Sequence, residues 1–158
     1  MSGGASSLQA AAGRGLTALG RRRWLAMTLA AFCLLLSSSA LAGSYLDRVE
    51  LLITRASEDS DYLRARITDK ELARVIHQMA EARLRAAEKM EIPAEAAQAH
   101  PHVLLVLEAH ERAAEAATRR DASRFLVMLN KAWDEERILR GVLKELGFPL
   151  PERRARGQ

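Results

Sequence analysis

The sequence predicts an all-α protein, an antiparallel up-down four-helix bundle that follows an N-terminal signal segment. The clearest evidence is the segment from Ala122 to Leu146, where apolar residues recur every three or four positions and charged residues fill the positions between them. Such a stripe is typical of a helix that buries one face against other helices. Three earlier segments repeat this spacing, and no segment alternates apolar and polar residues as a strand does. The links between the segments are short, which favours antiparallel neighbours.

Residues 1–42 have the three parts of a secretory signal peptide. Arg21 to Arg23 form a charged start, Trp24 to Leu36 form an apolar run interrupted only by Thr28, and three serines follow. Ala40 and Ala42 then supply the small residues that a signal peptidase requires, so we expect cleavage between Ala42 and Gly43. This divides the chain into a signal peptide (1–42), a helical bundle domain (43–148) and a flexible C-terminal tail (149–158).

An uncleaved N-terminal anchor is the alternative to this signal peptide, because residues 24–46 contain no charge. A helix needs about 20 apolar residues to cross a bilayer, and the unbroken apolar run here is shorter than that. We therefore prefer cleavage, which predicts a periplasmic or secreted protein. The anchored alternative would place the protein in the inner membrane, with membrane contact only through this segment.

The residues Arg21-Arg22-Arg23-Trp24-Leu25 resemble the twin-arginine export signal, which has two arginines, any residue and two apolar residues. That resemblance implies export of an already folded protein, often one that holds a cofactor. An ordinary secretory leader with an arginine-rich start explains the same residues, and we prefer it. The abundance of alanine and arginine suggests a bacterial genome rich in G and C.

The distribution of charge argues against a nucleic-acid partner. The formal net charge is +4, and the leader alone carries four arginines, Arg14 and Arg21 to Arg23, and no acid. The rest of the chain is therefore neutral and lacks the basic surface that phosphate binding requires. The single cysteine, Cys33, lies in the leader, which excludes disulfides and thiolate metal sites from the domain.

The first two helices of the domain are expected over residues 45–67 and 69–91. In the first, Tyr45, Val49, Leu52, Ala56, Leu63 and Ile67 share a face, although the polar run at residues 58–61 favours a break. Thr68 and Glu71 have the spacing of a capping box, which predicts Thr68 as the N-cap of the second helix. The predicted inner face of that helix comprises Leu72, Ile76, Met79, Ala86 and Met90.

The third and fourth helices follow a connection at residues 93–101. Pro101 suits the first turn of the third helix, and Asp121 is a good N-cap for the fourth. The inner face of the third helix comprises Val103, Val106 or Leu107, His110, Ala113 or Ala114, and Ala117. Gly147 followed by Pro149 predicts the end of the fourth helix.

Three polar residues fall on predicted apolar faces, namely Arg83, His110 and Glu136. In an antiparallel pair linked near residue 96, Arg83 lies opposite His110, and Glu136 lies within a turn or two of that level. The sequence therefore predicts a polar cluster in the core. We interpret it as a structural ion-pair network, because such networks are commoner in bundles than active sites.

Metal binding is a weaker hypothesis that depends on the histidines. His77 and Glu81 are one helical turn apart, and His100 and His102 flank Pro101, where Glu91 or Glu95 could join them around zinc or copper. The di-iron carboxylate bundles would require Glu three residues before His on two helices, and this chain lacks that pattern. We therefore predict no resident metal or cofactor.

No catalytic signature is present: the chain has no glycine-rich phosphate loop and no nucleophile elbow, and aromatic residues make up only 4%. The leading hypothesis is an exported, non-enzymatic helical bundle that acts through contacts with an unknown protein partner. The alternatives are a periplasmic bundle that binds a metal or cofactor through histidine, and an envelope stress chaperone. The chaperone family considered for comparison has Leu-Thr-x-x-Gln repeats, which are absent from this chain.

Overall fold

The computed structural model describes residues 43–151, which lie within one compact unit, Leu41–Gln158. These residues form four α-helices, one short 3-10 helix and no strand. The first helix covers residues 43–64 and is followed by α2 (Lys70–Glu88), η1 (Ala94–Ala96), α3 (His100–Thr118) and α4 (Ala122–Glu145). The all-α prediction is confirmed for this part of the chain.

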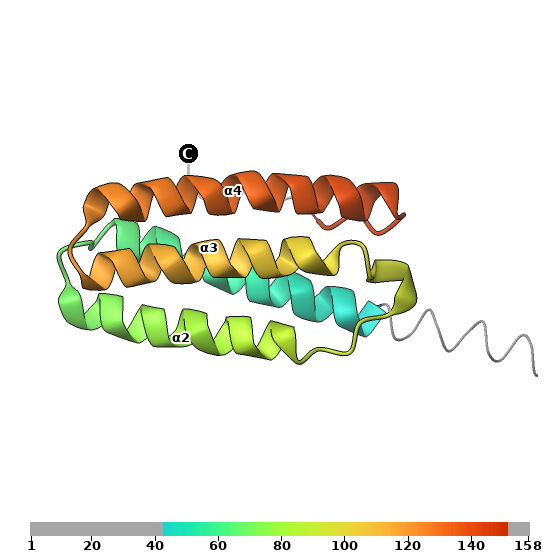
Figure 1. The fold of residues 1–158 in the computed structure, drawn as a ribbon, viewed down its shortest axis with the longest axis horizontal. Helices are drawn as coiled ribbons and strands as arrows, with labels where there is room; N and C mark the ends of the chain where they lie inside the picture. The colour runs from blue at the N-terminus through green and yellow to red at the C-terminus, as the bar shows by residue number, and fades with distance from the viewer. Residues whose placement is uncertain (1–42, 152–158) are drawn as a thin grey trace, which may run out of the picture. The chain divides into compact units, whose positions relative to one another are not determined.

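Successive helices run in opposite directions, as the up-down prediction required (Figure 1). In this view α3 lies between α2 and α4, and the first helix lies behind them. Side-chain contacts join the first helix to each of the others: Asp59 pairs with Arg83 of α2, and Ser60 bonds to His110 of α3. The guanidinium of Arg64 lies 5.8 Å from the ring centre of Trp133 on α4.

The first helix is continuous through residues 58–61, so the expected break does not occur. Two of the polar residues in this run, Asp59 and Ser60, face the bundle and hold partners on other helices. Their side chains are therefore satisfied without interrupting the backbone ladder. The inner face is made by Tyr45, Val49, Ile53, Ala56 and Leu63.

The predicted cap of α2 is wrong by one residue. The N-cap is Asp69, whose carboxylate oxygen Oδ1 accepts the backbone N–H of Leu72 at 3.0 Å. Thr68 precedes the cap and is exposed. Aspartate and threonine are both good N-caps, because either side chain can accept the N–H three residues ahead. The local sequence therefore permits the helix to start after Thr68 or after Asp69.

The expected inner face of α2 is also partly wrong. The buried residues are Ala73, Ile76, Ala80 and Ala87, whereas Met79 is 43% exposed. Small side chains thus face the bundle along this helix, and a large one faces solvent. The buried residues of α3 likewise include five alanines: Ala109, Ala113, Ala114, Ala116 and Ala117.

The connection between α2 and α3 contains one short helical turn, η1, directly after Pro93. α3 begins at His100 with Pro101 in its first turn, as predicted. Its expected inner face is confirmed, and both members of each adjacent pair are buried: Val106 with Leu107, and Ala113 with Ala114.

α4 has the capped start and the apolar stripe that its sequence predicts. Asp121 accepts the N–H of Arg124 at 2.9 Å. The buried positions are Phe125, Leu129, Ala132, Glu136, Leu139 and Leu143. The helix ends at Glu145 with Leu146 as its C-cap, and Gly147 follows with a φ of 87°, which suits glycine. The N–H of Phe148 bonds to the carbonyl of Leu143 at 2.8 Å.

The apolar core is divided into two clusters along the bundle. One contains Tyr45, Val49, Val103, Leu139 and Leu143, and the C-terminal residues Phe148 and Leu150 pack against it. The other contains Leu63, Ile76, Phe125 and Leu129, together with six alanines of α2 and α3: Ala73, Ala80, Ala113, Ala114, Ala116 and Ala117. Each helix contributes residues to both clusters, so the division crosses all four helices at one level.

Candidate functional site

A layer of polar residues separates the two apolar clusters, with a contribution from every helix. The first helix supplies Asp59 and Ser60, α2 supplies Arg83, α3 supplies His110, and α4 supplies Glu136. Ser60, His110 and Glu136 are each less than 5% exposed, at 3%, 2% and 4%. The three residues that the sequence predicted as a polar cluster thus lie in this layer.

Each of the three predicted residues in this polar layer bonds to a residue that the sequence did not single out. Arg83 donates to the carboxylate of Asp59, and the guanidinium side chain is only 12% exposed. The Nδ1 atom of His110 lies 2.8 Å from the hydroxyl of Ser60. Arg140, one turn beyond Glu136, donates to it at 2.7 and 3.0 Å.

This polar layer is suited to fixing the relative levels of the helices. Removing the partner of a buried charge or imidazole destabilises the folded state strongly. A shift of one helix along another would therefore be disfavoured. Ser60, His110 and Glu136 are almost fully buried, although Glu136 also lines a pocket with Trp133, Arg137 and Arg140. The structural interpretation made from the sequence stays a prediction.

His100 and His102 are directed to different parts of the bundle. His100 is buried, and its Nδ1 lies 3.0 Å from the hydroxyl of Tyr45 on the first helix. Burial lowers the pKa of His100 and raises the pKa of Tyr45 to about 12, so both groups favour their neutral forms. His102 instead lies 4.0 Å from the carboxylate of Glu135 on α4. The two imidazoles therefore do not converge on a common site.

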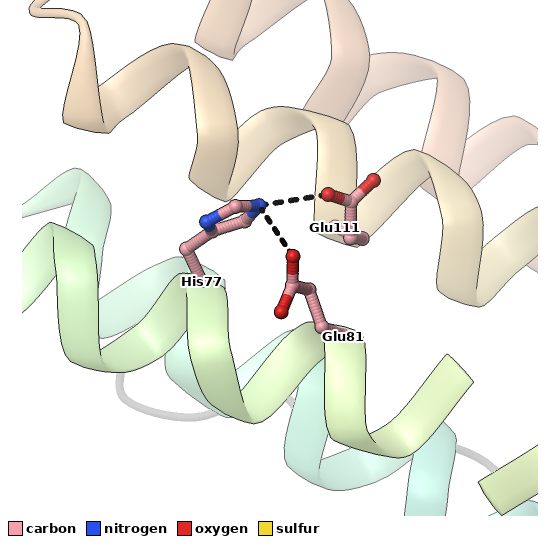
Figure 2. A group of neighbouring side chains, drawn as sticks. All are labelled: His77, Glu81 and Glu111. Atoms are coloured by element: carbon pink, nitrogen blue, oxygen red, sulfur yellow. Dashed lines mark hydrogen bonds and ion pairs between the residues drawn. The ribbon is translucent and has the colours of Figure 1, made fainter. Parts of the chain in front are cut away.

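His77 and Glu81 do converge, and a third ligand joins them from α3 (Figure 2). The Nε2 atom of His77 lies 2.8 Å from Oε1 of Glu111 and 3.8 Å from Oε1 of Glu81. The side chains of His77, Glu81 and Glu111 are 22%, 40% and 18% exposed. The group is therefore sheltered between two helices and still open to solvent.

The sequence predicted two members of this group, His77 and Glu81, but not Glu111. The pair on α2 is visible from its spacing of four residues, which puts both side chains on one helical face. Glu111 lies 34 residues beyond His77 and meets it only through the packing of α2 against α3. The neighbouring residue His110 was predicted because it falls on the inner face of the helix. Glu111 lies at the edge of the contact between α2 and α3.

Several predicted features lie outside the described residues. These are the signal segment, with Cys33 and the cleavage residues Ala40 and Ala42, and the tail after Pro151. Gly43, on the other side of the predicted cut, is the first described residue of the first helix. Within residues 43–151, no helix combines the length and the apolar character that crossing a bilayer requires.

Comparisons of the chain with protein-family models, with curated proteins and with solved structures gave no match.

Proposed function

We propose that the protein is an exported, non-enzymatic helical bundle that acts by binding another protein through the outer face of α2. The leader-like sequence of residues 1–42 supports export to the periplasm. The observation that favours binding is an apolar stripe on α2 that the bundle leaves uncovered, and we call it the α2 stripe: Val75, Met79, Ala82 and Ala86.

The members of the α2 stripe follow the spacing of one helical face, at intervals of four, three and four residues. Val75 is 51% exposed and Met79 is 43% exposed. Single exposed apolar residues are ordinary on protein surfaces, but a continuous row is characteristic of an interaction site. The outer face of a surface helix usually carries polar or charged residues at such positions.

The composition of the α2 stripe favours a helical partner. Two large side chains at one end provide contact area, and the alanines at the other end permit a close approach of a second backbone. Met79 adds a flexible side chain that adapts to different surfaces. We therefore infer that the partner presents an apolar face of a helix and belongs to the same compartment.

Photo-crosslinking in intact cells tests this proposal. A photoreactive amino acid at Ala82 should give one discrete crosslinked product in the envelope fraction. The substitutions Val75→Ser and Met79→Gln, made together, should abolish that product because they remove the apolar contact while leaving the inner face of α2 unchanged. Mass spectrometry of the product then identifies the partner and locates the crosslinked helix.

The matched control is the pair Val127→Ser and Ile138→Gln on α4, which are also exposed, at 56% and 46%. This variant should retain the crosslinked product. Loss of the product in both variants, or no product from Ala82 in the parent chain, would contradict the proposal. Light scattering of the purified variants distinguishes a partner protein from a second copy of this chain.

A further inference from the structure

We propose that His77, Glu81 and Glu111 form a binding site for one divalent transition-metal ion of the Zn²⁺ class. This site is separate from the α2 stripe and does not depend on it. Its basis is the convergence of one imidazole and two carboxylates from two helices, with the three ligand atoms all within 4.8 Å of one another (Figure 2).

The spacing of these atoms fits a small ion. Ligand atoms about 2.0–2.2 Å from a tetrahedral zinc ion lie about 3.3–3.6 Å apart. The distances from Nε2 of His77, 2.8 Å to Glu111 and 3.8 Å to Glu81, fall on either side of that range. Modest rotations of the side chains would therefore bring all three atoms into coordination.

The chemistry of the ligands selects the class of ion. An imidazole nitrogen favours transition metals over Mg²⁺ and Ca²⁺, which prefer sets of six or more oxygen atoms. Two carboxylates balance the charge of a divalent ion, which reduces the cost of placing it in a partly buried position. Three protein ligands leave one position of a tetrahedral ion for water.

The competing explanation is a purely structural ion pair, with a protonated His77 held between the two carboxylates. Glu81 also lies 3.6 Å from Arg85, which shows that it has an alternative partner on the surface. The two explanations differ in a measurable way, because only a metal site takes up Zn²⁺ in a saturable manner and coordinates it through Nε2 of His77.

The test uses the full chain, expressed with its own leader and without a histidine tag, purified as the cell processes it and treated with a chelator. Calorimetric titration with Zn²⁺ should give one ion per chain. His77→Ala and Glu111→Gln should each weaken binding by about tenfold or more, since loss of even a supporting partner of a ligand typically costs about 10–100-fold. Glu108→Gln, on the same helix and paired with Arg112, should bind as the parent does.

A second measurement keeps the proposal testable if a variant unfolds. In the parent chain with labelled imidazoles, Zn²⁺ should shift the ring nitrogen signals of His77 at one equivalent and leave those of His102 unchanged. Absence of saturable binding, binding that survives both ligand substitutions in folded protein, or a shift at His102 in place of His77 would overturn the proposal.

Discussion

Arg83 shows how a charged residue can occupy an inward position of a helix when a second helix supplies its partner. Its guanidinium meets Asp59 of the first helix at the level where the two apolar clusters are divided. The side chains are 12% and 25% exposed, so water screens this pair less than it screens a surface pair. We infer that the pair helps to fix the first helix against α2.

The substitution Arg83→Ala should lower the free energy of unfolding by about 1–3 kcal/mol, because it leaves the half-buried carboxylate of Asp59 without its cation. Urea unfolding followed by circular dichroism measures the change. Arg137→Ala is the control, since its pair with Asp134 is 79% and 63% exposed, and it should stay within about 0.5 kcal/mol of the parent. Equal effects of the two substitutions would refute the role given to Arg83.

His77, like Arg83, has a partner on another helix. Its partner on α2 is apparent from the sequence, because positions four apart on a helix are always neighbours. Its nearer partner, Glu111, is apparent only from the packing of α3 against α2. The candidate metal site therefore depends on one contact that local spacing does not specify.

At the scale of the element, α2 is the helix whose details were least predictable. Both its N-cap and part of its inner face differ from expectation. The residues before it, Thr68 and Asp69, are each good caps, and the choice between them depends on where the preceding turn ends. The turn includes a bond from the N–H of Asp69 to the carbonyl of Arg66 at 2.9 Å, which places Asp69 directly before the helix.

This assignment gives a direct test of the cap. Asp69→Ala should lower the free energy of unfolding by about 1 kcal/mol, because the N–H of Leu72 loses its acceptor. Thr68→Ala should have a much smaller effect, since the structure gives the capping bond to Asp69. Thermal and urea unfolding of the two variants compare them. A larger loss from Thr68→Ala would show that the capping box is the true start of α2.

At the scale of the whole molecule, the bundle combines a divided apolar core with an uncovered stripe on one helix. The polar layer lies between the two clusters, and alanines of α2 and α3 share one of them. Small residues of α2 face the core, and Val75 and Met79 lie on the outside. The surface proposed to bind a partner is thus a consequence of how the core is filled.

The proposed export of the molecule predicts a defined N-terminus. Chain purified from the periplasm should begin at Gly43, because the residues before it end in the small-x-small pattern that signal peptidase cuts. Intact-mass spectrometry of protein expressed with its own leader measures this directly. An intact chain of 17.4 kDa in the membrane fraction would support the N-terminal anchor over the signal peptide.

The sequence by itself determined the helical class, the number of helices in the described region and the buried stripe of α4. It also determined the residues that flank that helix, namely the N-cap Asp121 and Gly147 just past the C-cap. These features are local: the 3.6-residue period and the capping positions depend only on residues within a few turns of one another.

Only the tertiary structure decided which residues of different helices meet. It paired Arg83 with Asp59 and brought Glu111 to His77, and it turned Met79 outward. The physical reason is that the level and rotation of one helix against another follow from how side chains of all the helices fill the space between them. Successive residues lie about 100° apart around the helix axis. A shift of one residue in which position faces the core therefore separates a buried side chain from an exposed one.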